Sequence, residues 1–144
     1  MAFLNSLNIA GSALTAERVR TDIILQNIAN INTTRTANGD PYRRQQVVFE
    51  DRGLSFEEML NGEKYKANGG GVRVKEIVEN QSDFIPVYDP SHPHANADGY
   101  VMMPNVNRAE EMVDLMAASR AYEANVTAVS VIKAMAMKAL EIGK

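Results

Sequence analysis

Two histidines on either side of a single proline are the residues best suited to metal binding or catalysis. His92, Pro93 and His94 follow Asp89 and precede Asp98. Two imidazole rings and a carboxylate are a donor set that zinc accepts. The proline leaves the two histidines without a helical or strand register that would fix their geometry, so the motif alone is weak. We therefore expect no metal, no cofactor and no catalytic residue here.

The other polar motifs favour structural roles. Residues 69–71 are three glycines, but no Lys-Ser or Lys-Thr follows them, so we expect a turn or hinge and not a phosphate loop. Arg43 and Arg44 stand beside Tyr42 and could form a small anion-binding patch. Because the chain is acidic overall, we expect an ion pair between subunits instead. No catalytic triad follows from spacing, and the sequence predicts a protein that is not an enzyme.

The composition narrows the function classes further. The chain has 144 residues, enough for one ordinary domain, and its net charge of −3 argues against a nucleic-acid binder. The absence of cysteine excludes disulfides, thiolate zinc sites and thiol nucleophiles. Residues 1–16 lack the positive start of a cleavable signal peptide, and Arg120 and Lys133 interrupt the apolar stretches that a membrane span needs. We expect a protein that is cytosolic or exported without a cleaved signal.

Proline and charge divide the chain into three regions. All five prolines lie between positions 41 and 104, and most charges lie between Arg35 and Arg108. Because proline breaks helices, we predict an N-terminal assembly helix within 1–34, a β-containing middle over 35–104 and a C-terminal assembly helix within 105–144. The predicted fold class is α+β, mainly α, with the two long terminal helices packed as an antiparallel, coiled-coil-like pair.

The predicted elements have definite boundaries. The first helix runs from Ala2 to about Asn30, and the last begins at Asn107, whose spacing to the glutamate three residues later matches a capping box. A slip of the alternation near Glu76 predicts a bulge, and Pro86 assigns its strand to a sheet edge. The predicted strands cover 46–50, 72–78, 84–88 and 100–102.

Both terminal helices carry apolar residues three and four positions apart, which is the pattern of a packing seam. Few charges lie on either helix, so both lack the polar face of an ordinary surface helix. A helix pair has no third layer, so we expect other chains to cover surface residues such as Ala118, Ala121 and Val131. A self-contained domain whose helices cover the strands is the alternative. The predicted assembly interface comprises Leu4, Leu7, Leu14, Leu25, Ile28, Met112, Leu115, Tyr122, Val126, Val129, Ile132 and Met135.

Several segments together resemble bacterial flagellar rod and hook proteins. Residues 25–33 (LQNIANINT) are similar to the signature near the N-terminus of that family, and 98–107 (DGYVMMPNVN) to its approach to the C-terminal helix. The match continues through 111–125. The short length, together with 41–45 (PYRRQ) and 89–93 (DPSHP), indicates the proximal-rod type. The resemblance covers nearly the whole chain.

The resemblance implies a structural subunit of the proximal rod of the flagellar basal body. The rod is the drive shaft that transmits torque from the rotor to the hook. Such proteins are exported by the flagellar type III apparatus without signal cleavage and polymerise in the periplasm. The implied partners are other proximal-rod proteins, the rod–ring junction protein, the distal rod protein and further copies, with no cofactor, nucleic acid or membrane span.

The expected arrangement follows from this role. The terminal helices would form the inner layer of a tube, with the middle region facing outward. Ends that become ordered only on assembly would suit export through a narrow channel. Three alternatives stay open: another rod-family subunit, a soluble coiled-coil adaptor, and a metal-dependent enzyme that uses His92 and His94.

Overall fold

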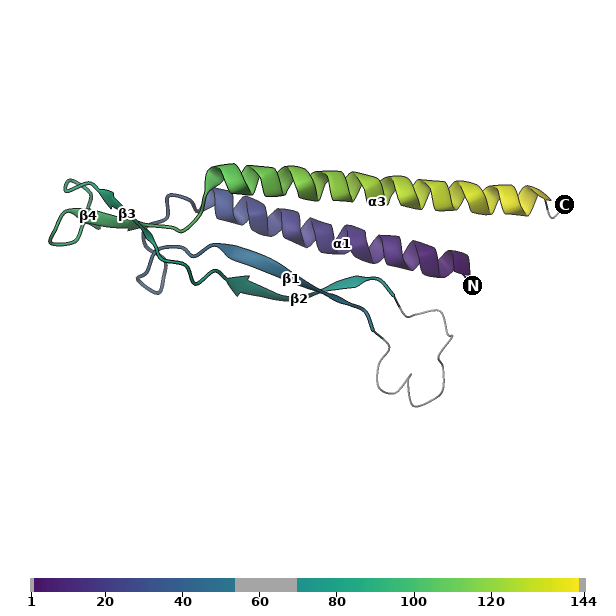
Figure 1. Ribbon diagram of the computed structural model, residues 1–144, viewed down its shortest axis with the longest axis horizontal. Helices are drawn as coiled ribbons and strands as arrows, with labels where there is room; N and C mark the ends of the chain where they lie inside the picture. Colours follow the sequence, from purple (N-terminus) through teal and green to yellow (C-terminus); the bar gives the residue numbers. More distant parts are fainter. Residues whose placement is uncertain (1, 54–69, 143–144) are drawn as a thin grey trace.

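The computed structural model describes residues 2–53 and 70–142, and this part of the chain is long and narrow (Figure 1). α1 (Ala2–Ala29) and α3 (Arg108–Ile142) lie side by side and run antiparallel. Their free ends, at residues 2 and 142, therefore lie at the same end of the molecule. The predicted antiparallel pair of long terminal helices is confirmed.

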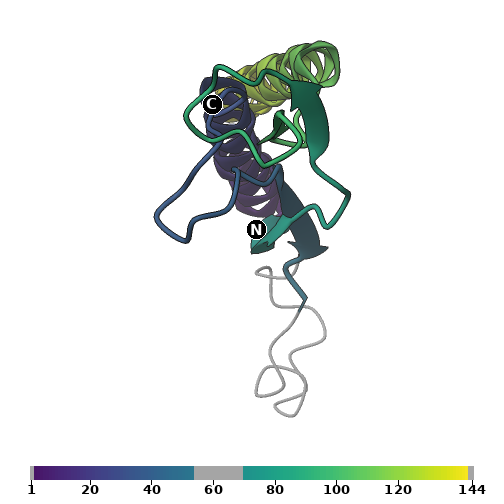
Figure 2. The same cartoon turned by 90° about the vertical axis from the view of Figure 1, so that its left-hand side faces the viewer.

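A β-hairpin forms a third layer beside the helices. β1 (Gln45–Asp51) and β2 (Val72–Glu79) pack along α1 on the side away from α3, so that α1 lies between the hairpin and α3 (Figures 1 and 2). The prediction that the helix pair has no third layer was wrong for α1. Among the described elements, α3 packs only on α1, so most of its surface stays uncovered.

The hairpin contains the predicted bulge. Val48 of β1 pairs with Glu76. The next residue, Phe49, pairs with Val74, so Lys75 is an extra residue in β2. A bulge bends a strand and increases its twist. The bend lets a two-stranded ribbon follow the surface of a helix.

The end opposite the free helix ends is a second, smaller ribbon. β3 (Ile85–Tyr88) pairs antiparallel with β4 (Tyr100–Met103), and in this two-stranded sheet Pro86 lies on an edge, as predicted. Gly99 precedes β4 with a φ of +82°, a conformation that glycine adopts without strain. The rings of Tyr88 and Tyr100 meet edge to face, 5.3 Å apart between centroids. The four predicted strands are thus all present.

The start of α3 is capped by Asn107. Its Oδ1 accepts a hydrogen bond of 3.0 Å from the backbone N–H of Ala109, which is the N-cap contact that the sequence predicted. Asn107 bonds Ala109 and not the backbone of Glu110, and Glu110 makes no return bond to Asn107 within the described residues, so the predicted capping box does not form. The next residue, Glu111, points into the molecule and is fully buried.

The contact between the helices is built from small residues. Ala118 is fully buried and Ala121 is half-buried, so the prediction that both lie on the outer surface was wrong. Ala118 lies two helical turns from Glu111 and so on the same face of α3, the face that meets α1. Ala10, Ala16, Ile23 and Ile24 are the buried apolar residues of α1. Alanine on both helices allows them to approach closely.

Candidate functional site

Asn27 is buried near the C-terminal end of α1, and its amide makes four hydrogen bonds. Nδ2 donates to the carbonyl of Gln45 (2.8 Å) and to a carboxylate oxygen of Glu111 (3.0 Å). Oδ1 accepts from the backbone N–H of Gln45 and from the hydroxyl of Tyr42, both at 2.9 Å. The amide therefore bonds the first residue of β1 as a neighbouring strand would. It also holds the first turn of α3.

Glu111 is a fully buried carboxylate with a charged partner. Nε of Arg44 donates to its Oε1 at 2.5 Å, and Nη2 of the same guanidinium donates to Asp114 at 3.0 Å. Arg20 of α1 lies 3.8 Å from the other Asp114 oxygen. Removing one partner from such a pair leaves a buried charge uncompensated. The arrangement therefore fixes which segments meet more than it adds to stability.

Asn105 connects the approach to α3 with the segment after β2. Its Oδ1 accepts from the backbone N–H of Arg44 at 2.8 Å. Its Nδ2 donates to the carbonyls of Asn80 (3.0 Å) and Ser82 (3.1 Å). We refer to Asn27, Tyr42, Arg44, Asn105 and Glu111 together as the polar node. The node ties α1, β1, the residues after β2 and α3 into one unit.

Arg43 and Arg44, for which an ion pair between subunits was predicted, both bind groups inside the chain. Arg44 pairs with Glu111, and Arg43 lies over the ring of Phe84 at 4.3 Å while its guanidinium donates to the carbonyl of Ser82 at 3.3 Å. The prediction of an ion pair between subunits was wrong for Arg44. The buried carboxylate of Glu111 supplies the counter-charge within the chain.

The surroundings of Tyr42 in the node shift the pKa of its phenol. Burial raises the pKa of its phenol above the usual value of 10.0, and the negative charges of Glu111 and Glu79 raise it further. The neutral hydroxyl is thus the form that donates to Asn27. Its role in the fold depends on keeping that proton.

The sequence has no local signal that singles out the node. Gln26 precedes Asn27 and Glu110 precedes Glu111, so each buried polar residue stands beside an exposed polar one. The partners of Asn27 could not be found from spacing, because Asn27 and Glu111 are 84 positions apart.

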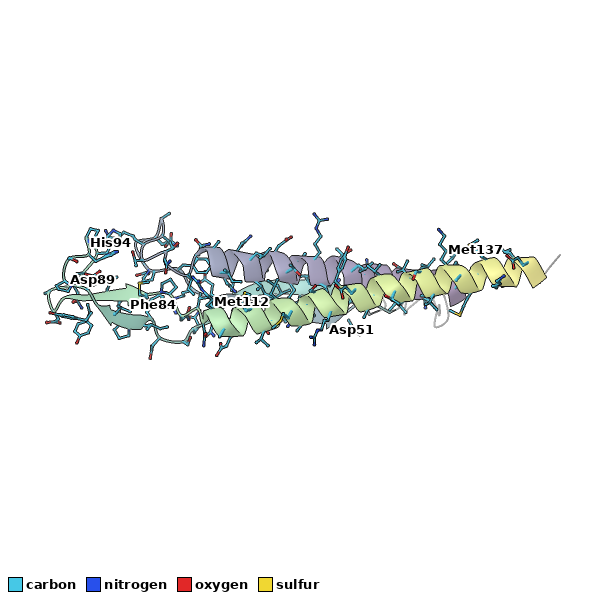
Figure 3. The ribbon with its side chains drawn as sticks, turned by 90° about the horizontal axis from the view of Figure 1, so that it is seen from above. Asp51, Phe84, Asp89, His94, Met112 and Met137 are labelled. Atoms are coloured by element: carbon cyan, nitrogen blue, oxygen red, sulfur yellow. The ribbon has the colours of Figure 1, made fainter. Side chains whose placement is uncertain are left out.

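The predicted interface residues lie on two kinds of surface. Six are half-buried against neighbouring elements: Leu7, Leu14, Ile28, Leu115, Val129 and Ile132. Six are exposed: Leu4, Leu25, Met112, Tyr122, Val126 and Met135. Figure 3 shows the labelled side chains of Met112 and Met137 near opposite ends of α3. The exposed set leaves an apolar surface along both helices, and its contact with other chains stays a prediction.

The two histidines lie in the turn between β3 and β4. Their rings meet edge to face at 5.3 Å, and the backbone N–H of His94 donates to Nδ1 of His92 at 3.1 Å. The hydroxyl of Thr34 lies 2.8 Å from Nδ1 of His94. Asp89 accepts instead from the hydroxyl and backbone of Ser91, which lowers the pKa of its carboxyl. Among the described residues, no three histidine, cysteine, aspartate or glutamate side chains are grouped so that they could hold a metal ion.

Known protein families match both terminal regions of the chain. Residues 7–35 match the family of flagella basal body rod proteins, and residues 97–142 match the C-terminal family of flagellar basal body rod FlgEFG proteins. The flagellar basal-body rod protein FlgC of Bacillus subtilis is 51% identical over 150 aligned positions that cover all of both chains. The chain belongs to the flagellar basal-body rod family. FlgC of Borreliella burgdorferi is 43% identical over 99% of this chain and 98% of its own, and FlgC of Escherichia coli O157:H7 is 42% identical over all of both.

Membership of the rod family confirms the function predicted from the sequence. The chain is a structural subunit of the proximal rod in the flagellar basal body, and it assembles with other rod components. The two matched regions contain Asn27 on one side and Asn105 and Glu111 on the other, so the node joins them. No helix of the described chain is long and apolar enough to cross a membrane.

Proposed function

We propose that this chain polymerises through the exposed faces of α1 and α3 into the part of the rod that carries torque from the rotor to the hook. The observation that supports this most is the apolar surface at the free ends of the helices. Leu4 of α1 is 64% exposed and Leu140 of α3 is 73% exposed, and Met135 and Met137 of α3 are 59% and 56% exposed. An apolar surface of this extent marks an interaction site. The role requires no catalysis by this chain.

The polar node suits a subunit that must resist twisting. Torque transmitted through a subunit shears its elements against one another. Hydrogen bonds at Asn27 and the ion pair of Arg44 with Glu111 oppose sliding of α1, β1 and α3 along their length. Interdigitated side chains alone allow such sliding more easily than directional bonds do. The node therefore supports the role of a stiff element.

The finer assignments rest on the family. We place the chain in the periplasmic part of the rod after export by the flagellar type III apparatus without cleavage. Its neighbours are other proximal-rod proteins, the rod–ring junction protein, the distal rod protein and further copies. The division into assembly helices within 1–34 and 105–144 and a middle region over 35–104 is part of the same proposal.

Deleting residues 130–144 tests the proposal. The deletion removes the most exposed apolar stretch of α3 and leaves the node intact, so we expect a stable chain that is no longer found in isolated basal bodies and cells that do not swim. The matched control is the double variant Lys138→Ala, Glu141→Ala, which removes only an exposed ion pair of the same stretch. Normal motility of the deletion strain would overturn the proposal.

A further inference from the structure

A groove open to solvent runs between α1 and α3, with no hairpin residue in its walls. It is lined by Arg18, Thr21, Asp22, Leu115, Ser119 and Tyr122. Leu115 and Tyr122 belong to the predicted assembly interface. Leu25 and Val126, also predicted interface residues, lie about one helical turn beyond Thr21 and Tyr122 and are 48% and 46% exposed.

Two charged residues on this groove form no ion pair in the part of the chain that the structure describes. Arg18 and Asp22 are exposed and form no ion pair there. The same holds for Arg120 and Glu123 of α3. Each pair combines one positive and one negative side chain, about one helical turn apart. Each pair could therefore neutralise the other across an interface.

Arg120 and Glu123 lie on the face of α3 turned away from α1. Val113 and Met116 precede them at the same three- and four-residue spacing and are 60% and 53% exposed. Ala118, which is fully buried against α1, lies on the opposite side of the helix. This outer face of α3 is an apolar stripe with one charge pair within it. The groove likewise combines apolar side chains, Leu115 and Tyr122, with one positive and one negative side chain.

We propose that the groove receives the outer face of α3 from a second copy of this chain, with Arg18 paired to Glu123 and Asp22 to Arg120 of that copy. This inference rests on the proposed function, since it specifies one contact of the polymer. The apolar stripe at Val113 and Met116 would extend along Leu25 and Leu115. Charge pairs at the rim of such a contact set its register and partner choice more than its strength.

The register of this contact has a geometric consequence. Within one chain, Asn27 of α1 lies level with Glu111 of α3. Pairing Arg18 with Glu123 and Asp22 with Arg120 moves the second α3 along its axis by about one helical turn, roughly 5 Å, relative to the first. The contact joins two different surfaces, so it repeats from copy to copy. With an axial step at each contact, the repeat gives an open helical assembly and not a closed ring.

Cross-linking in isolated basal bodies tests the contact directly. The chain has no cysteine, so introduced thiols are unique within it. With Arg18→Cys and Glu123→Cys in the same chain, a short bis-maleimide reagent should give dimers and larger multiples of the chain. Each single variant should give none, because every contact needs one residue of each kind. The double variant Lys75→Cys, Glu123→Cys is the control, because Lys75 is exposed on β2 and outside the groove.

Charge reversal gives an independent reading of the same contact. Arg18→Glu should reduce the amount of the chain in basal bodies, and the double variant Arg18→Glu, Glu123→Arg should restore it. Lys75→Glu should leave incorporation unchanged.

The outcomes separate the two proposals. A ladder of multiples together with charge rescue supports the contact. Cysteine variants that enter the basal body but give no ladder overturn it and leave the proposed function standing, since a different rod protein then occupies the groove. Absence of the unaltered chain from basal bodies would overturn the proposed function itself.

Discussion

Asn27 contacts the residues before β1, β1 itself and α3 through one amide group. Each of the two polar atoms of the amide makes two hydrogen bonds. Nδ2 donates to Gln45 and Glu111, and Oδ1 accepts from Gln45 and Tyr42. Among uncharged side chains only those of asparagine and glutamine offer two donors and two acceptor positions on one amide, and glutamine is one methylene longer. Asparagine at this position is therefore set by chemistry and not by helix propensity, which is unfavourable for it.

Replacing Asn27 by alanine should destabilise the chain by about 2–4 kcal/mol, because buried groups of Gln45, Tyr42 and Glu111 lose their partner. Asn27→Asp should be at least as harmful, since a carboxylate cannot donate to Glu111 and repels it. Urea denaturation of the purified chain measures both. Gln26→Ala, on the exposed side of the same helix, is the control and should change stability by less than about 0.5 kcal/mol. Equal effects at positions 26 and 27 would contradict the role given to the node.

The raised pKa of Tyr42 predicts a loss of stability in alkali. Since the folded state holds the phenol proton more tightly than the unfolded state, the stabilisation is complete below the unfolded pKa of about 10. It is lost as the pH rises through the folded value. Tyr42→Phe should flatten this part of the pH–stability curve while lowering stability at neutral pH. Denaturation midpoints from pH 8 to 11 measure it, and a slope unchanged in the variant would contradict the assignment.

At the scale of elements, α1 acts as the support on which the hairpin is registered. Ser12 and Asn27 hold the hairpin at two places: Oγ of Ser12 accepts from the backbone N–H of Val72 at 3.0 Å, and Asn27 binds Gln45. The two anchors are fifteen residues apart on one helix, which is about 22 Å. A ribbon of two strands is marginal alone, so this support gives it one register.

Gly71 shows how closely the hairpin approaches α1. Its φ is +104°, and a Cβ there would overlap the hydroxyl of Ser12. Gly71→Ala should therefore destabilise by about 2–4 kcal/mol, from backbone strain and the displaced Ser12–Val72 hydrogen bond together. Gly39→Ala is the matched control, because its φ is +92° with open space around it, and only the strain of about 1–2 kcal/mol remains. Thermal unfolding compares the two, and a larger effect at position 39 would refute the close approach.

The helices and strands were predictable from the sequence, but the tertiary contacts between them were not. Hydrophobic spacing and Asn107 place α3 to within a residue, and the slip near Glu76 locates the bulge, because these signals are local. The packing of the hairpin on α1 and the bond from Asn27 to Glu111 join distant positions, which single-sequence periodicity does not encode. The sequence also assigned Ala118 to the outside, because alanine fits both a close contact and a surface.

At the scale of the whole molecule, order should decline from the node toward the free helix ends. Around Asn27 and Glu111 the helices are joined by buried hydrogen bonds, whereas Leu4 and Leu140 at the far end are largely exposed. Local opening is easiest where few apolar contacts are buried. Neighbouring copies would supply the missing contacts in the rod.

Hydrogen exchange of a verified monomer measures this gradient. We expect strong protection of amides near residues 20–29 and 111–120, and fast exchange over 3–9 and 131–142. In assembled rods the two classes should become similar. Uniform strong protection along both helices of the monomer would contradict the expectation that the ends are completed by other subunits.

Residues 2 and 142 occupy one pole of the molecule, and the paired tyrosines of β3 and β4 occupy the other (Figure 1). The two ends of each subunit therefore differ chemically, so the subunit has a direction along its long axis. If the contacts between copies join unlike surfaces, all copies along the rod point in the same direction. A gold particle attached near one end of the subunit would then report this direction. Its position along the rod axis in an electron micrograph shows which end of every subunit faces the hook.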